Sequence, residues 1–413
     1  MRGVIWLVLL FVVAVVAATT LGSNDGLVTI YWSGWRTDLS LNLFVLLVVG
    51  GCFLLLSAAQ ALSALLSLPQ RASEWRALKR ERAAQAALRQ ALGEYFSARY
   101  SRAHRAAAKA LTIQGETPEL QDDQEFRLLG HLLAAGSLHR LQDRPRRDAL
   151  MAPLLQSLRK GGGSEDGARL LAAEWALDDR DAPRALELLA GLPPGVARRT
   201  QALRLKLQAA RLARQPMDAL HTARLLANHQ AFTPAAATGL LRSLAFEVLE
   251  SAHDVQQLRR LWEQFDHADR RDAQVAARAA QRAVRLQACE DARLWLRPFW
   301  ERLAELPRED RDSVALALAA AVPGLGTDWL PRLESAATQF AHEPAVLAAV
   351  GAAFAERQLW GKARRLLEQA AGAPNLPGDA RRQAWRLLAR LARSDGDEAR
   401  ALRCEQAAAA IDG

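Results

Sequence analysis

Four arginines near the C-terminal end of this sequence could bind an anionic ligand. They are Arg382, Arg386, Arg390 and Arg393. Because they are three or four positions apart, they share one face of a helix. Guanidinium groups bind carboxylates through paired hydrogen bonds, so the row is suited to an acidic peptide or a carboxylate. A solvated helix face explains the same spacing, and both interpretations remain open at this point.

A second chemical candidate is a pair of histidines. His131 and His139 are eight residues apart, so on one helix they share a face about two turns apart. His131 is the candidate axial ligand of a haem, which would need a partner from elsewhere in the chain. The alternative is that both are polar or half-buried helix residues, and the other histidines are dispersed. We expect no metal site and no resident cofactor other than this one haem candidate.

Catalytic motifs are missing from the sequence. It contains no phosphate-binding loop, no complete glycine-rich dinucleotide motif and no HExxH, GxSxG or CxxCH. The three cysteines, Cys52, Cys289 and Cys404, form no CxxC pair. We therefore expect no catalytic residues, and the protein is predicted not to be an enzyme.

Two apolar runs lie near the start of the sequence, before the helices expected to carry the arginines and histidines. Uncharged segments begin at Val4 and at Leu41, and they predict transmembrane helices over 4–21 and 41–66. A cleaved signal peptide is the alternative for the first run. Pro69 is expected to end the second helix.

Charge sets the expected orientation in the membrane. The net charge is +9, and residues 70–115 carry ten Lys or Arg and three Glu. A basic block after an apolar run suits anionic lipid headgroups rather than nucleic acid. By the positive-inside rule, we expect a multi-pass protein of a bacterial inner membrane with its C-terminal domain in the cytoplasm. The basic segment is interpreted as an amphipathic helix on the inner leaflet, with a solvated linker helix as the alternative.

The predicted periplasmic loop, 22–40, contains the stretch LVTIYWSGWRTDLSLN. Its alternating residues and the Ser33-Gly34 dipeptide predict a short hairpin. Aromatic residues are typical of the membrane interface. The predicted interface residues are Tyr31, Trp32, Trp35, Arg36 and Asp38.

After the basic segment, small and apolar residues recur with the spacing of tetratricopeptide helix pairs. The clearest unit is AVLAAVGAAFAERQLWGKARRLLEQAAGAP. Small residues allow close helix approach, and larger ones fill the seam between the helices. The predicted repeat-packing residues are Gly351, Phe354, Trp360, Ala363, Leu367, Ala370, Trp385 and Ala401.

Weaker units have the same pattern. Ala185 and Ala219 are 34 residues apart at the central small position. One earlier unit is predicted from Ala280, Ala283, Ala292, Leu296 and Phe299. Another, near the basic segment, is predicted from Gly93, Phe96, Tyr100, Ala103 and Ala110. One helix pair cannot bury its seam alone, so neighbouring pairs must stack into an α-solenoid.

The predicted fold class is therefore all-α, with two N-terminal transmembrane helices, a hairpin-like loop and a solenoid of tetratricopeptide-like pairs. The expected domains are a membrane anchor (1–69), a basic juxtamembrane helical region (70–160) and a repeat domain (161–413). The glycine-rich segment KGGGSEDG, 160–167, is expected to be a flexible connection.

This arrangement resembles the HemY family of proteobacterial inner-membrane proteins. The resemblance is carried by VTIYWSGWRTDLSLN, by the following LNLFVLL and by RYSRAHRAAAKAL. It implies a scaffold in late protohaem biosynthesis whose partners are pathway enzymes. A flavin-dependent protoporphyrinogen oxidase of other bacteria has shared this family name, but the chain lacks its glycine-rich flavin motif, so the resemblance does not imply that activity. A direct haem or porphyrin carrier, and a cell-envelope scaffold unrelated to haem, are the alternatives.

Overall fold

The computed structural model describes residues 26–157 and 163–411, without the side chains of residues 63–72, 119, 163 and 164. It divides into two compact units, Met1–Leu154 and Leu155–Gly413, which are described separately. This division lies close to the boundary expected between 160 and 161. The apolar segment predicted to span the membrane at 4–21 lies outside the described residues.

The first unit begins with a two-stranded antiparallel hairpin. Strand β1 (Leu27–Trp32) pairs with β2 (Trp35–Ser40), and Trp32 lies opposite Trp35 next to the turn. Ser33 and Gly34 both have positive φ, 46° and 88°. Two consecutive residues with positive φ are typical of the tight turns whose twist matches that of a hairpin. The hairpin predicted for this stretch is therefore present.

Helix α2 (Leu41–Phe96) follows the hairpin directly. Ser40 caps it by accepting a 3.4 Å hydrogen bond from the Leu43 amide. The segment Leu41–Leu62 is the one described helix that is long and apolar enough to cross a membrane. Most of its Leu, Phe and Val side chains are exposed, as expected for residues that face lipid.

The expected break at Pro69 is wrong, because α2 continues through it to Phe96. Proline removes one backbone donor, but the surrounding Ala, Leu, Gln and Arg residues are strong helix formers. The helix has 56 residues, which corresponds to a length of about 84 Å. The basic segment is thus a continuation of the apolar segment and not a separate helix, and the domain boundary expected between 69 and 70 falls inside α2.

Three further helices follow α2: α3 (Tyr100–Gly115), α4 (Gln124–Arg140) and α5 (Arg144–Ser157). Buried alanines of α2, α3 and α4 pack together, among them Ala91, Ala107 and Ala134. A Cβ at Gly130 would lie 2.7 Å from Leu111 Cδ2. Small residues therefore set the close spacing of α3 and α4.

Two residues of the pair predicted near the basic segment do not pack as expected. Phe96 is 79% exposed, and a Cβ at Gly93 would meet nothing within 4 Å. The last turn of α2 presents these two positions away from α3. Ala103 and Ala110 of the same predicted pair are fully buried.

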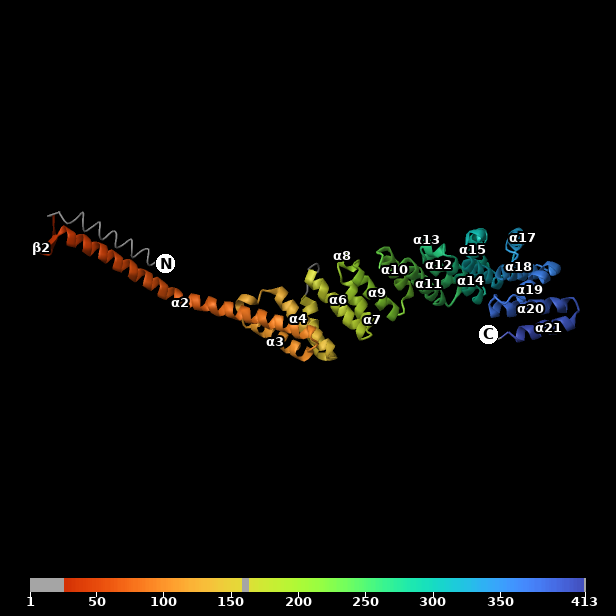
Figure 1. Ribbon diagram of the computed structural model, residues 1–413, viewed down its shortest axis with the longest axis horizontal. Coiled ribbons are helices and arrows are strands. Elements are labelled where there is room, and N and C mark those ends of the chain that lie inside the picture. Colours follow the sequence, from red (N-terminus) through yellow and green to blue (C-terminus); the bar gives the residue numbers. More distant parts are fainter. Residues whose placement is uncertain (1–25, 158–162, 412–413) are drawn as a thin grey trace. The chain divides into compact units, whose positions relative to one another are not determined.

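The second unit consists of helix pairs (Figure 1). The pairs are α6 (Gly163–Asp178) with α7 (Ala182–Ala190), α9 (Thr200–Leu212) with α10 (Pro216–Asn228), α11 (Pro234–Glu250) with α12 (Val255–Gln264), α14 (Ala273–Arg285) with α15 (Cys289–Trp300), α16 (Arg308–Ala320) with α17 (Leu330–Gln339), α18 (Pro344–Glu356) with α19 (Trp360–Ala371), and α20 (Gly378–Ser394) with α21 (Glu398–Ala409). Short helices α8 (Pro194–Ala197) and α13 (His267–Arg270) lie in connections. Because α6 begins at Gly163, the second half of the segment expected to be flexible is helical.

The helix pairs stack through their first helices. Helix α16 contacts both α14 and α15, α18 contacts both α16 and α17, and α20 contacts both α18 and α19. Each new pair therefore covers the seam of the preceding one, which is the stacking expected for a solenoid. The described part of the chain is mostly helical, as predicted.

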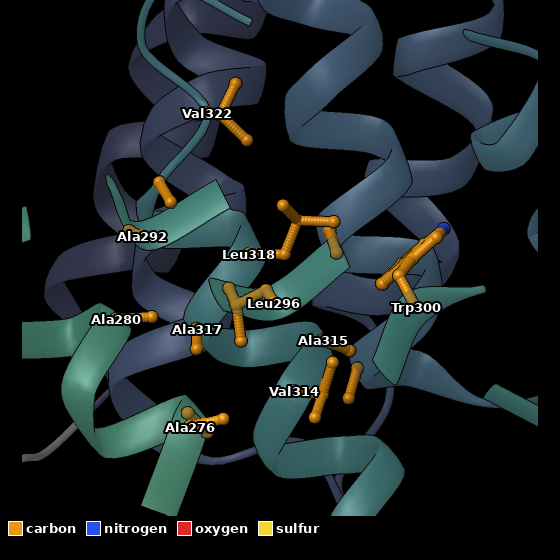
Figure 2. Close-up of a cluster of buried hydrophobic side chains, with 14 of the residues drawn as sticks. Ala276, Ala280, Ala292, Leu296, Trp300, Val314, Ala315, Ala317, Leu318 and Val322 are labelled. Atoms are coloured by element: carbon orange, nitrogen blue, oxygen red, sulfur yellow. The ribbon is translucent and has the colours of Figure 1, made fainter. Parts of the chain in front are cut away.

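Buried alanines and leucines form the core of this unit. Figure 2 shows part of it, where Leu296 of α15 lies among Ala280 of α14 and Ala317 and Leu318 of α16. All four side chains are fully buried. Alanines bring the helices close together, and each leucine fills the space that they leave.

Several turns between consecutive helices share one backbone conformation. Their central residue has positive φ, at Gln142, Arg180, Arg214, Gln287, Gln358 and Gly396. At Gln287 the next amide, of Ala288, donates to the Ala283 carbonyl at 2.8 Å. This bond belongs to the Schellman motif, which favours glycine at the left-handed position. Most of these turns use a residue with a Cβ instead.

We expect Gln287→Gly to stabilise the second unit by about 0.5–1 kcal/mol, because a left-handed residue with a Cβ is strained. The matched control is Gln281→Gly in the middle of α14, which should cost about 0.5–1 kcal/mol. Thermal unfolding of the full chain in detergent measures both. Equal shifts of the same sign would contradict the explanation.

Candidate interaction cleft

The four arginines of the predicted row lie on α20 and face a cleft between α20 and α21. The cleft has a volume of about 670 Å³. On the α20 side it is lined by Arg382, Arg386, Arg390 and Arg393. The α21 side contributes Glu405 and the small side chains of Ala408 and Ala409. The row therefore faces a hollow whose far wall combines one carboxylate, Glu405, with small apolar side chains.

The cleft has an excess of positive charge. Arg393 forms an ion pair with Glu405, and Arg382 Nη2 lies 3.5 Å from an oxygen of Asp379, whose side chain is 95% exposed. Arg386 and Arg390 are exposed and have no acidic partner in the described part of the chain. The buried Nε of Arg382 also has no hydrogen-bond partner among those residues. Such guanidinium groups are available to an incoming carboxylate.

Two smaller cavities lie beside the same helix, between α20 and the first helices of the preceding pairs. One of about 410 Å³ is lined by Ala319, Ala352 and Arg390, and one of about 190 Å³ by Ala319, Ala348 and Ala384. Gln383 and Leu387 line all three cavities. One face of α20 therefore links the cleft to the surface formed by α16 and α18.

Trp360 differs from its prediction as a packing residue. Its side chain is 39% exposed and lines the 410 Å³ cavity with Glu356 and Gln358. It is the first residue of α19, and a helical side chain lies over the turn before its own Cα. The indole therefore covers the α18–α19 turn and does not enter the seam.

The other residues predicted to pack the repeats lie mostly in the core. Phe354, Ala363, Leu367, Ala370 and Ala401 are at most 2% exposed, and Trp385 packs partly buried against the same cluster. A Cβ at Gly351 would lie 2.8 Å from Leu367 Cγ and 3.2 Å from the Leu367 amide nitrogen. Gly351 thus lies at a close approach of α18 and α19.

The hairpin residues predicted for the membrane interface are all exposed. Tyr31, Trp32 and Trp35 are 74–82% exposed, so their rings are free to contact lipid. Arg36 Nε lies 3.3 Å from Asp38 Oδ1, and the Arg36 guanidinium lies 5.9 Å from the centre of the Tyr31 ring. The arginine therefore has two partners within the hairpin.

The two histidines of the haem hypothesis have different surroundings on α4. His131 is half-buried, and its Nδ1 lies 2.8 Å from the Arg127 carbonyl oxygen. His139 is 7% exposed, and its Nδ1 lies 2.8 Å from Arg147 Nη1. Since arginine only donates, His139 accepts this bond and Nδ1 is not free to bind a metal. The described ranges contain no group of three or more potential metal ligands.

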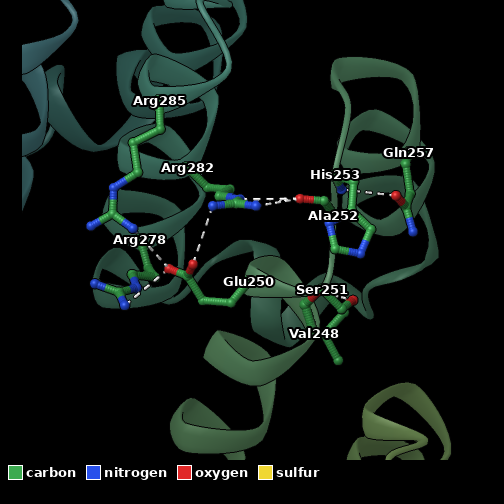
Figure 3. Close-up of polar contacts among 9 residues, drawn as sticks. All are labelled: Val248, Glu250, Ser251, Ala252, His253, Gln257, Arg278, Arg282 and Arg285. Atoms are coloured by element: carbon green, nitrogen blue, oxygen red, sulfur yellow. Dashed lines mark hydrogen bonds and ion pairs between the residues drawn. The ribbon is translucent and has the colours of Figure 1, made fainter.

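Sequence reasoning missed a cluster of arginines between α11 and α14 (Figure 3). Arg278 Nη2 lies 3.0 Å from Glu250 Oε1, and Arg282 lies 3.4 Å from the other oxygen of the same carboxylate. Arg282 also donates two hydrogen bonds to the Ala252 carbonyl beyond the end of α11. The cluster caps that helix and joins neighbouring pairs, so its role is structural.

Burial raises the pKa of two carboxyl groups between the pairs. Desolvation raises the pKa of Asp269, although Arg224 opposes this. Desolvation also raises the pKa of Asp312 on α16, against an opposing effect of Arg308. The charged forms are therefore less favourable in the folded protein than in the unfolded chain.

We expect Asp312→Asn to be more stable than the parent chain at pH 7. The folded pKa of Asp312 lies above its unfolded value of 3.8, so its stabilising contribution is present below pH 3.8 and is lost as the pH rises through the folded pKa. Asparagine cannot ionise and avoids that loss. Thermal unfolding from pH 3 to pH 7 measures the difference, which should be smallest at the acidic end. A constant difference across the range would contradict this assignment.

A likeness to one solved structure is distant. It is the crystal structure of the APC/C hetero-tetramer Cut9-Hcn1, with 15% sequence identity and a TM-score of 0.29. The alignment covers 78% of this chain and 65% of that chain. None of the curated proteins matches the sequence.

A family model does match the first unit. The model, described as the HemY protein N-terminus, matches residues 26–142, which comprise the hairpin, α2, α3 and α4. This match includes the three sequence stretches that carried the resemblance. Residues 26–142 are therefore a HemY N-terminal domain, in agreement with the resemblance that the sequence indicated.

Proposed function

We propose that this protein is a membrane-anchored scaffold that holds partner proteins near the inner membrane for a late step of protohaem biosynthesis. The observation that carries the proposal is the continuity of α2, which joins an apolar segment, Leu41–Leu62, to a helical domain without a break. The helix pairs of the second unit support it, because stacked pairs present an extended surface for proteins. The HemY match supports the link to haem.

In this proposal the protein is multi-pass and its C-terminal domain is cytoplasmic. The basic residues that follow the apolar segment on α2 support that orientation. These basic residues continue the same helix beyond its apolar segment. They therefore contact lipid headgroups next to that segment and do not form a separate helix lying on the membrane surface. The partners proposed are enzymes of the tetrapyrrole pathway, and the protein itself has no catalytic role.

The test uses the full chain with an affinity tag, crosslinked in membranes of the source organism and then solubilised. We expect recovery of at least one tetrapyrrole enzyme, together with porphyrin accumulation, measured by fluorescence, when the protein is removed. Recovery of no such enzyme and unchanged porphyrins would overturn the proposal. A saturable Soret shift with haemin that is lost in His131→Ala would instead support the haem-carrier alternative.

A further inference from the structure

We infer that the cleft between α20 and α21 binds an acidic amphipathic helix of a partner protein. This helix would occupy the position that the first helix of a following pair occupies elsewhere in the unit. The inference rests on the proposed scaffold function and adds the site and the chemistry of the partner. It is carried by the stacking pattern, by the residues that line the cleft and by their charge.

The stacking pattern identifies the cleft as a helix-binding surface. In each of the three preceding pairs, α14–α15, α16–α17 and α18–α19, both helices contact the first helix of the next pair. In the described part of the chain no further helix covers α20 and α21 in this way, and their shared surface contains the 670 Å³ cleft. A partner helix placed there would extend the stack by one element.

The last two pairs can be aligned at their left-handed turn residues, Gln358 and Gly396. The alignment shows which side chains of α20 differ from those at equivalent positions of α18. Ala348 lies ten positions before Gln358 and lines a cavity against α20; its counterpart ten positions before Gly396 is Arg386. Ala352, six positions before Gln358, corresponds in the same way to Arg390. Arginines thus replace the alanines that face the next helix.

This replacement determines the charge of the occupant. A helix that packs against α20 at these positions meets Arg386 and Arg390, which have no acidic partners among the described residues. An apolar helix would leave their charges desolvated and unpaired at a cost, whereas Glu or Asp side chains would pair with them. The occupant must therefore be acidic where it faces α20.

The spacing and the far wall favour a helix over a small anion. Arg382, Arg386 and Arg390 are four residues apart, about 6 Å along the axis, which matches acidic residues at every fourth position of a partner helix. Ala408, Ala409 and Ile411 line the opposite side and offer apolar contact, while Glu405 on that side is already paired with Arg393. A free phosphate would use only the charges, whereas an amphipathic helix uses both sides of the cleft.

The probe for the test is a fluorescent peptide of about 18 residues, with Leu and Ala on one helical face and Glu at every fourth position beside it. Its Glu→Gln counterpart serves as the neutral control. Binding to the full chain in lipid nanodiscs is followed by fluorescence anisotropy. We expect saturable binding of the Glu peptide, weakened by added salt, and at least about tenfold weaker binding of the Gln peptide.

The variant that tests the site is Arg386→Glu/Arg390→Glu, which should also weaken binding of the Glu peptide by at least about tenfold. The matched control is Arg403→Glu on α21, because Arg403 is exposed but does not line the cleft. This variant should bind the Glu peptide as tightly as the parent chain does. Circular dichroism checks that each variant is folded. The charge-conserving Arg386→Lys/Arg390→Lys variant should retain part of the affinity.

Several results would overturn the inference. These are equal binding of the Glu and Gln peptides, an unchanged affinity in the folded Arg386→Glu/Arg390→Glu variant, and an equal loss in Arg403→Glu. Self-association of the chain that the double variant abolishes, seen by light scattering, would assign the cleft to a second copy instead. If tetrapyrrole enzymes are recovered equally with the parent chain and with the double variant, the scaffold function stands and the proposed helix site is wrong. If no such enzyme is recovered while the peptide binds as expected, the helix site stands and the scaffold function in haem biosynthesis is wrong.

Discussion

Replacing Gly351 with leucine is expected to destabilise the second unit by about 3 kcal/mol. Gly351 lies where α18 and α19 approach closely, and an added Cβ would be 2.8 Å from Leu367 Cγ and 3.2 Å from a backbone nitrogen. Because backbone atoms cannot rotate away, the two helices must separate. Thermal unfolding of the full chain in detergent should show a melting temperature lower by roughly 5–10 °C.

The control for Gly351 lies in the same helix pair. A Cβ at Gly361, on α19, would meet nothing within 4 Å. Gly361→Ala should therefore stabilise the helix by about 0.5–1 kcal/mol, since glycine has the larger conformational entropy to lose. An unchanged melting temperature in Gly351→Leu would show that the α18–α19 seam is not as close as described.

Replacing Leu296 with alanine is expected to cost about 2–5 kcal/mol. Leu296 of α15 is fully buried between α14 and α16, among the side chains drawn in Figure 2. Its removal leaves a cavity that the surrounding alanines are too small to fill. Denaturant unfolding of the full chain in detergent measures the loss.

Leu294 on the same helix provides the matched control, because its side chain is 65% exposed. Leu294→Ala should change the stability by no more than about 0.5 kcal/mol. Hydrogen exchange should also increase in α14 and α16 only for Leu296→Ala. Similar losses in the two variants would mean that the core of these pairs lies elsewhere.

Local features of the fold were predictable because they depend on neighbours in the chain. The Ser33-Gly34 turn, the apolar segment from Leu41 and the small residues at Ala185 and Ala219 all follow from propensity or periodicity. The helix through Pro69 was missed because proline is a strong local signal for a helix end. In α2 the strong helix formers on both sides outweigh it.

The candidate cleft was only half predictable. Helical spacing placed the four arginines on one face of α20, since that depends on 3.6 residues per turn. What they face depends on how α21 packs, and the sequence contains no local signal for that. Trp360 was misplaced for the same reason, because its spacing fits the repeat while its side chain covers a turn.

The sequence by itself determined that this protein has an apolar segment, a hairpin, a helical body and a row of arginines, because each is a pattern along one element. Only the tertiary structure decided that Gly351 touches Leu367, and that Arg386 and Arg390 occupy positions where the preceding pair has alanines. These features arise from contacts between helices. Such contacts depend on how side chains from distant parts of the chain fill the space between the helices, and local periodicity does not encode that.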